Sequence, residues 1–242
     1  GIKFINIPTT LMSQIDAGIG GKVAVNLDNH KNQIGLFSDP ELVVIYPPFL
    51  NSLLNDDFIS AQTEIFKYGL ISNLLFWNKV SSMKISQGDD LEPLIIECIK
   101  IKLSIVSVDY YDYSERRKLN FGHSVAHAIE SLFIDNNNPI SHGLALSVGL
   151  ICETYISHIY YSFSQKKLDE VSNAIFNVFP HIFIDPKDDE AILNYINSDK
   201  KNVNSLLKFT LLQDIGSAVV NRVVSNNDII LSLDFYRKKC HI

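Results

Sequence analysis

The sequence has few cysteines, no excess of basic residues and no long apolar run. Its three cysteines, Cys98, Cys152 and Cys240, are odd in number and far apart, so they match neither a disulfide framework nor a thiolate metal site, and a reducing cytoplasm is the expected compartment. The net charge is -6, with 21 Lys and Arg against 27 Asp and Glu. It gives no overall positive field to attract nucleic acid or anionic lipid. No apolar run approaches the roughly 18 residues of a membrane span. We therefore expect a cytoplasmic protein with no nucleic-acid or membrane partner.

The chain has ample hydrophobic residues for a core, and their pattern changes once along the sequence. Hydrophobic residues make up 46% of 242, which suits one large domain or two small ones. Up to about Pro48, short β-branched runs such as IKFINI and ELVVIY alternate with turns, a pattern typical of an α/β unit. We therefore expect a partial α/β domain over residues 1–48 and a mainly helical domain over residues 49–242.

After about Pro48 the sequence consists of long amphipathic stretches with apolar residues at helical spacing. They predict helices near residues 55–79, 91–108, 121–134, 142–162, 164–178 and 227–239. Between the last two, LLKFTLL and SAVVNRVV flank QDIG, which predicts a β-hairpin. The first 48 residues contain only two convincing strands, too few to cover a parallel sheet. Either that sheet is unusual or its first strands lie outside this chain.

The segment FGHSVAHAIE raises the question of metal binding. His123 and His127 are four residues apart, on one face of a predicted helix. Alone, such a pair is more often two ordinary polar residues. Here His142 opens the next helix in SHGLALSVG, and TEIFKYG places Glu64 and Lys67 three residues apart on another. Two histidines and one carboxylate with an open fourth position form a known catalytic zinc arrangement, although spacing leaves open which three residues complete the set.

Five motifs together carry a resemblance to a known family. PTTLMSQIDAGIGGK, KNQIGLF, TEIFKYG, RKLNFGHSVAHAIE and SHGLALSVG occur in this order, and the chain resembles the 3-dehydroquinate synthases, which are sugar-phosphate cyclases. The resemblance implies the remnant of a Rossmann-like α/β domain that binds NAD, followed by an all-α domain with a small β-hairpin. It implies zinc, or cobalt in its place, at the boundary between the two domains, and a homodimer. The implied reaction converts 3-deoxy-D-arabino-heptulosonate 7-phosphate to 3-dehydroquinate with release of phosphate, a step of the shikimate pathway.

The resemblance also implies roles for individual residues. The metal ligands would be Glu64, His123 and His142, leaving His127 to bind substrate and transfer a proton. The other substrate positions would be Asp16, Lys22, Asn32, Lys67, Lys102, Arg116, Asn120, and Lys200 or Lys201. Of these, Lys67, Lys102 and Arg116 are also expected to take part in catalysis. The cofactor positions would be Thr9, Thr10, Lys31, Phe49, Leu50, Asn51 and Ser52.

The chain also departs from the family pattern. Asp112 stands where the family usually has a glutamate that takes part in proton transfer, so the charge is kept but the reach is shorter by one methylene. Family members usually carry roughly another hundred residues before PTTL, including a glycine-rich turn that receives the pyrophosphate of NAD. We therefore expect this chain alone to bind NAD weakly and to turn over poorly or not at all. The alternatives are a non-catalytic remnant or fragment, or a related cyclase that makes another cyclitol.

Overall fold

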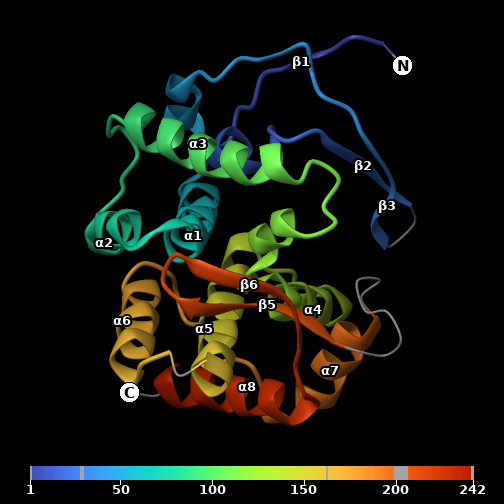
Figure 1. Cartoon of the computed structure of the whole chain (residues 1–242), viewed down its shortest axis with the longest axis vertical. Helices are drawn as coiled ribbons and strands as arrows, with labels where there is room; N and C mark the ends of the chain where they lie inside the picture. The colour runs from blue at the N-terminus through green and yellow to red at the C-terminus, as the bar shows by residue number, and fades with distance from the viewer. Residues whose placement is uncertain (1, 28–29, 162, 199–206, 241–242) are drawn as a thin grey trace. The chain divides into compact units, whose positions relative to one another are not determined.

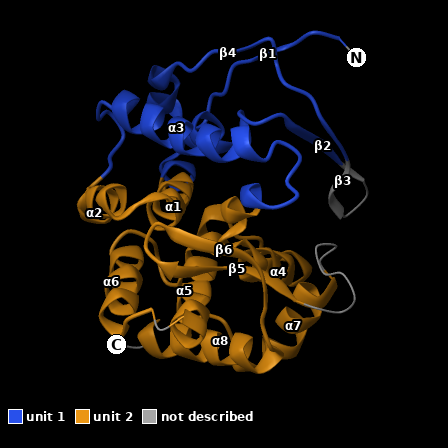
Figure 2. Cartoon of the chain, in the orientation of Figure 1, with its two compact units in different colours: residues 1–58, 85–116 blue, residues 59–84, 117–242 orange. Residues whose placement is uncertain are grey.

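The computed structural model describes residues 2–27, 30–161, 163–198 and 207–240, with the side chains of residues 26–34 left out. The chain forms two compact units, Gly1–Phe58 with Ile85–Arg116, and Ile59–Lys84 with Arg117–Ile242 (Figure 2). Residue contacts thus group 85–116 with the N-terminal part. The boundary predicted near residue 48 divides an NAD-binding part from a metal- and substrate-binding part. This division by function stays a prediction.

The first unit combines short strands with one long helix. Strand β1 (Ile5–Asn6) pairs in parallel with β4 (Leu42–Val43), and β2 (Lys22–Leu27) pairs antiparallel with β3 (His30–Phe37). A π-helical segment, η1 (Ser13–Ala17), packs against α3 (Glu92–Val108), and η2 (Pro47–Ser52) precedes α1 (Asn55–Ser72). Apolar residues on η1 and α3, such as Ile15, Leu94 and Cys98, form its core.

The second unit is a helical domain built around α5 (His142–Tyr161). Helix α5 packs against α4 (His123–Asp135), α6 (Gln165–Phe176), α8 (Asn226–Cys240) and strand β5 (Lys208–Asp214), which forms a hairpin with β6 (Ser217–Val223) (Figure 1). The remaining elements are α2 (Leu74–Ser82), α7 (Asp189–Ser198) and the 3-10 segments η3 (Glu115–Asn120) and η4 (Pro186–Asp188). Because partners surround α5, nearly all of its middle turns are buried.

The predicted fold class is confirmed: a short α/β part precedes a mostly helical domain with a β-hairpin. Three details differ from the sequence-based expectations. The helix predicted over residues 55–79 is two helices, because the side chain of Asn73 accepts a hydrogen bond from Phe76 N at 2.8 Å and starts α2. Helix α7 and the β2–β3 hairpin were not predicted. None of the described helices combines the length and apolar character needed to cross a bilayer.

Candidate active site

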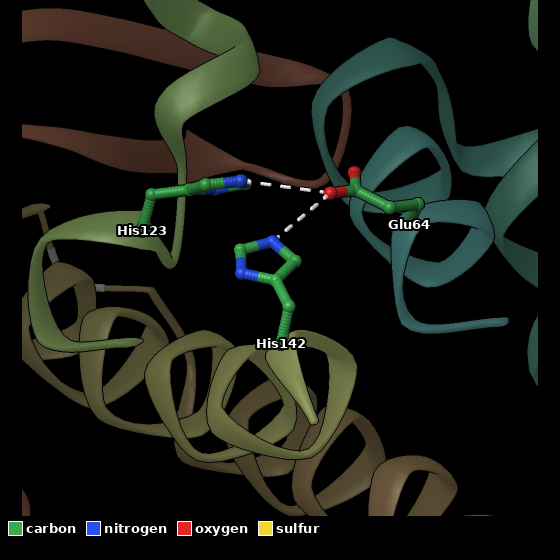
Figure 3. A group of neighbouring side chains, drawn as sticks. All are labelled: Glu64, His123 and His142. Atoms are coloured by element: carbon green, nitrogen blue, oxygen red, sulfur yellow. Dashed lines mark ion pairs between the residues drawn. The ribbon is translucent and has the colours of Figure 1, made fainter. Parts of the chain in front are cut away.

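Three potential metal ligands meet within the second unit. Glu64 lies on α1, whereas His123 and His142 are the first residues of α4 and α5 (Figure 3). Glu64 Oε1 lies 3.5 Å from His123 Nε2 and 3.7 Å from His142 Nε2. One ligand atom from each residue lies within 4.8 Å of the other two. The fold therefore brings the three predicted ligands together.

Hydrogen bonds orient both imidazoles toward Glu64. His123 Nδ1 lies 3.2 Å from the Phe121 carbonyl oxygen, and His142 Nδ1 lies 3.4 Å from Glu130 Oε2. When Nδ1–H donates to these acceptors, the lone pair of Nε2 is free for a metal. Sequence reasoning missed Glu130. Its signal was its position seven residues after His123, on the same face of α4.

The charges of the group also suit a cation. Glu64 is 2% exposed, and burial raises its pKa, but Lys67 and hydrogen bonds with the two histidines outweigh burial and hold that pKa well below its usual value. Burial lowers the pKa of His123. For His142, burial lowers the pKa too, but hydrogen bonds with Glu130 and Glu64 raise it to about 9. Glu64 is therefore anionic and His123 neutral, as metal binding requires, whereas His142 carries a proton at neutral pH that a bound metal would have to displace.

The donor set fits zinc. Zinc bound tetrahedrally at about 2.0–2.1 Å keeps its ligand atoms about 3.4 Å apart, close to the 3.5 and 3.7 Å that separate Glu64 Oε1 from the imidazole nitrogens. Lys67, which is 1% exposed, forms an ion pair with the other carboxylate oxygen, Oε2. One oxygen is thus held by the ammonium while Oε1 faces the histidines. Three protein ligands leave a fourth position open.

His127 lies beside this group without joining it. Its ring centroid is 5.4 Å from that of His123 and 6.0 Å from that of His142, and it is half-buried. Among the described residues, the group that could hold a metal consists of Glu64 and the other two histidines. His127 therefore lies beside the predicted metal ligands, and its substrate and proton-transfer role stays a prediction.

In the first unit, Arg116 is a buried cation held mainly by neutral groups. It is 2% exposed, and its two terminal nitrogens donate to the Tyr110 carbonyl at 2.6 Å and the Gly20 carbonyl at 2.5 Å. Its guanidinium carbon lies 5.7 Å from the Phe37 ring centroid. Within the described structure, buried Nε has no hydrogen-bond partner. A fixed guanidinium with a spare N–H is suited to bind a carboxylate or phosphate.

The turn before Arg116 is ordered by Asp109, which sequence reasoning did not select. Its carboxylate accepts hydrogen bonds from the backbone N–H groups of Tyr113, Ser114 and Arg116 at 3.0, 2.7 and 3.0 Å. Burial raises the Asp109 pKa, but these bonds outweigh it and lower the pKa to about 2. This turn also holds Asp112 in a left-handed conformation, with φ of 64°.

Three other predicted substrate residues of this unit, Lys22, Lys102 and Asp16, form ion pairs. Lys22 Nζ lies 2.6 Å from Asp112 Oδ2. The lysine of GIGGK therefore forms an ion pair, within the first unit, with the aspartate that stands where the family usually has a glutamate. Lys102 Nζ lies 2.7 Å from Asp16 Oδ1 and 2.5 Å from the Asp16 carbonyl oxygen. The fold thus pairs Lys22 with Asp112 and Lys102 with Asp16. Their substrate roles stay predictions.

The predicted cofactor residues lie mainly in and around η1 and η2. Leu50 and Asn51 line a cavity of about 550 Å³. Phe49 does not line it, and its ring centroid lies 5.1 Å from that of Tyr46, which does. Ser52 donates to the Phe49 carbonyl at 3.0 Å. Thr9 is exposed, and Thr10 hydrogen-bonds Ser13 at the start of η1.

The remaining predicted positions are described only in part. Lys31 and Asn32 lie in β3, but their side chains are outside the described residues, as are Lys200 and Lys201 entirely. Asn120 is the last residue of η3 and is half-buried. The structure therefore leaves the proposed roles of these five residues as predictions.

Comparison with known proteins gives matches along nearly the whole chain. Residues 1–60 match the family model described as 3-dehydroquinate synthase N-terminal, and residues 61–202 match 3-dehydroquinate synthase C-terminal. A 3-dehydroquinate synthase of Parabacteroides distasonis is 38% identical over 240 residues, which cover 98% of this chain and 68% of that protein. The chain belongs to the 3-dehydroquinate synthase family. This confirms the resemblance found in the motifs.

Other members of the 3-dehydroquinate synthase family match over a similar length. The protein of Clostridium botulinum is 37% identical over 220 residues, which cover 90% of this chain and 62% of that protein. The chain thus spans about two thirds, or slightly less, of the length of these curated relatives.

Solved structures support the fold of this family member. A 2-deoxy-scyllo-inosose synthase complexed with carbaglucose-6-phosphate, NAD+ and Co2+ matches with a TM-score of 0.82 and 24% identity, covering 96% of this chain and 66% of that one. The 2-epi-5-epi-valiolone synthase ValA from Streptomyces hygroscopicus, with NAD+ and Zn2+ bound, matches with a TM-score of 0.79 and 22% identity, covering 98% and 67%. At these identities the likeness concerns the fold alone.

Proposed function

We propose that the protein is a metal- and NAD-dependent lyase that converts 3-deoxy-D-arabino-heptulosonate 7-phosphate to 3-dehydroquinate and releases phosphate. The observation that carries the proposal is the group of Glu64, His123 and His142, with both Nε2 atoms within 3.7 Å of Glu64 Oε1, in a chain of the 3-dehydroquinate synthase family. When bound, the divalent metal supplies Lewis-acid polarisation of substrate hydroxyls, and NAD accepts and returns a hydride.

The residues of the second unit would hold the metal and move protons beside it. Glu64 Oε1 and the Nε2 atoms of His123 and His142 are the ligands. Lys67 forms an ion pair with Oε2, the other carboxylate oxygen of Glu64. The carboxylate therefore offers one oxygen, Oε1, in a fixed direction. His127, whose ring is 5.4 Å from that of His123, would bind a substrate hydroxyl and exchange a proton at a ring nitrogen.

The residues of the first unit would bind the charged groups of the substrate. Arg116 offers Nε–H to an anion, because its terminal nitrogens are already held by carbonyl groups. Lys22 and Lys102 supply further ammonium donors, oriented by Asp112 and Asp16. Asp112 would accept or return a proton at Oδ2. Such fixed donors suit a molecule that carries both a carboxylate and a phosphate.

The cavity at η2 fits part of a dinucleotide. Its volume of about 550 Å³ is in the usual range for small-molecule sites. Apolar side chains such as Leu50, Ile95 and Ile99 line it together with Asn51 and the acidic residues Asp89, Asp90 and Glu92, so the cavity would suit a flat base rather than the anionic pyrophosphate. We infer that Leu50 and Asn51 contact NAD here, while the cofactor roles of Phe49 and Ser52 stay predictions.

The test is a product assay with the purified chain, zinc, NAD and 3-deoxy-D-arabino-heptulosonate 7-phosphate. Released phosphate and 3-dehydroquinate, identified by NMR, should form in equal amounts. Glucose 6-phosphate serves as the alternative substrate, since the fold also matches a cyclase complexed with carbaglucose-6-phosphate. Turnover of glucose 6-phosphate alone would favour a related cyclase. Stoichiometric zinc binding without turnover of either substrate, at NAD concentrations high enough to saturate a weak site, would favour the non-catalytic alternative.

We also propose that the chain works as a homodimer in the cytoplasm. The dimer follows from the family resemblance, and the compartment from three cysteines that form no disulfide with one another, of which Cys98 and Cys152 are buried. Light scattering of the purified protein tests the dimer: a mass of one chain at micromolar concentration would contradict it.

A further inference from the structure

The first turn of α4 is buried, and its N-cap residue has no side chain that could accept a hydrogen bond from it. Gly122 occupies the N-cap position with φ of 83°, and no side chain of the N-cap residue accepts a hydrogen bond there. Phe121, Gly122 and Val125 are all buried, so water cannot readily satisfy the free N–H groups of this helix end. The first helical residue is His123, a metal ligand. The partner of these N–H groups therefore matters to the metal site.

Glu153, in the middle of α5, is that partner. It is 0% exposed. Its Oε2 accepts from Gly122 N at 2.7 Å, and its Oε1 accepts from Ser124 N at 3.0 Å and Val125 N at 3.3 Å. One carboxylate thus binds backbone N–H groups on both sides of His123. A carboxylate is favoured at a helix N-terminus because the N–H dipoles point toward it.

Close packing fixes the same turn from a second direction. A Cβ atom added at Gly149, one turn before Glu153, would lie 1.9 Å from the Gly122 carbonyl oxygen, and one added at Gly122 would lie 2.7 Å from Leu150 Cδ2. The backbone before His123 therefore rests directly on α5. Any movement of this turn would also move the imidazole that it carries.

We propose that Glu153 is a positioning residue of the metal centre, which holds the first turn of α4 so that His123 Nε2 faces Glu64 Oε1. It does this without belonging to the ligand set. The proposal rests on the proposed metal function. Loss of the carboxylate would leave buried N–H groups without an anionic partner, and the turn would relax. Because His123 belongs to this turn, the direction in which its Nε2 points would change, while the overall fold would persist.

The experiment compares Glu153→Gln with Thr154→Val in the full chain. The Glu153→Gln change keeps the size of the side chain but presents an NH2 group to N–H donors. Thr154 is the matched control, because it is also 0% exposed and its hydroxyl only donates to the Leu150 carbonyl within α5, at 2.6 Å. The measurements are zinc affinity by competition with a chromophoric chelator, the visible absorption of the cobalt-loaded protein, and thermal unfolding of the metal-free protein.

We expect Glu153→Gln to weaken zinc binding about 10–100-fold and to change the cobalt absorption bands, which report ligand geometry. Thr154→Val should leave both unchanged even if its unfolding temperature falls. Wild-type affinity and an unchanged cobalt spectrum in folded Glu153→Gln would overturn the proposal, as would an equal loss in Thr154→Val. If Glu153→Gln does not fold, Glu153→Asp takes its place, and an unchanged affinity and spectrum there overturn the proposal equally. Failure of the wild-type chain to bind zinc would instead overturn the metal centre itself.

Discussion

At the scale of single residues, two histidines one helical turn apart have different neighbours. His123 Nε2 lies 3.5 Å from Glu64 Oε1, whereas His127 does not belong to the group of Glu64, His123 and His142 that could hold a metal. We predict that His123→Ala loses zinc on dialysis and that His127→Ala retains about one zinc per chain, measured by elemental analysis. Retention in His123→Ala together with loss in His127→Ala would reverse the two assignments.

The spare N–H of Arg116 predicts selective anion binding. Arg116→Lys keeps the charge but loses the planar donors, and hydrogen bonds to charged groups are worth about 1.5–3 kcal/mol. Calorimetric titration with inorganic phosphate should therefore show roughly tenfold or greater weakening. Arg117→Lys is the matched control, because the adjacent Arg117 side chain hydrogen-bonds exposed Asn221 instead. Equal phosphate affinity in wild type and Arg116→Lys would remove Arg116 from the anion site.

The carboxylate of Asp109 predicts a specific dependence of stability on pH. Its folded pKa of about 2 lies below the ordinary value of 3.8, so its stabilising effect is fully present above pH 3.8 and is lost as the pH falls toward 2. Urea unfolding of wild type and Asp109→Asn should therefore differ most above about pH 4 and converge at lower pH. A difference that stays constant from pH 5 to pH 2 would mean that the three N–H bonds do not lower this pKa.

At the scale of elements, α5 is positioned by glycines that allow other segments to approach closely. A Cβ atom added at Gly143 would lie 1.9 Å from the Ser60 carbonyl oxygen on α1, and Gly143 N donates to Ser60 Oγ at 3.1 Å. We predict that Gly143→Ala destabilises the protein by about 1–3 kcal/mol or more and weakens zinc binding, since His142 is the preceding residue. Urea unfolding and chelator competition measure the two effects.

Ser147→Ala is the control for that prediction. Ser147 lies on the same helix and donates only to the Leu144 carbonyl, at 2.7 Å, so this change adds no atom to the contact with α1. A stable Gly143→Ala variant with unchanged zinc affinity would show that the close approach of α1 and α5 is not needed to place His142.

Long elements with regular apolar spacing could be predicted from the sequence, and short or exposed ones could not. Helices such as α3 and α5 bury residues at helical spacing, which is the signal that predicts them. Helix α7 has only 10 residues and buries two, Ile192 and Ile196. In β2, residues 22–25 are all exposed, so no alternation of buried and exposed positions marked the strand. The break at Asn73 did have a signal, an asparagine just before an apolar run.

At the scale of the whole molecule, the motifs indicated the family and the candidate ligand residues but not the contacts that support them. Glu64, His123 and His142 stand in three separate motifs, and the fold brings them together. The contacts that orient them join residues distant in sequence: Glu130 reaches His142, and Glu153 reaches the turn that carries His123. Such contacts depend on how α4 packs on α5, which no local pattern encodes.

The most direct test of the account is X-ray diffraction from zinc-loaded crystals, recorded on both sides of the zinc absorption edge. The account predicts one anomalous peak bounded by Glu64 Oε1 and the Nε2 atoms of His123 and His142, at about 2.0–2.2 Å from each. A peak bound by His127 in place of either histidine, or zinc bound only elsewhere in the crystal, would contradict it.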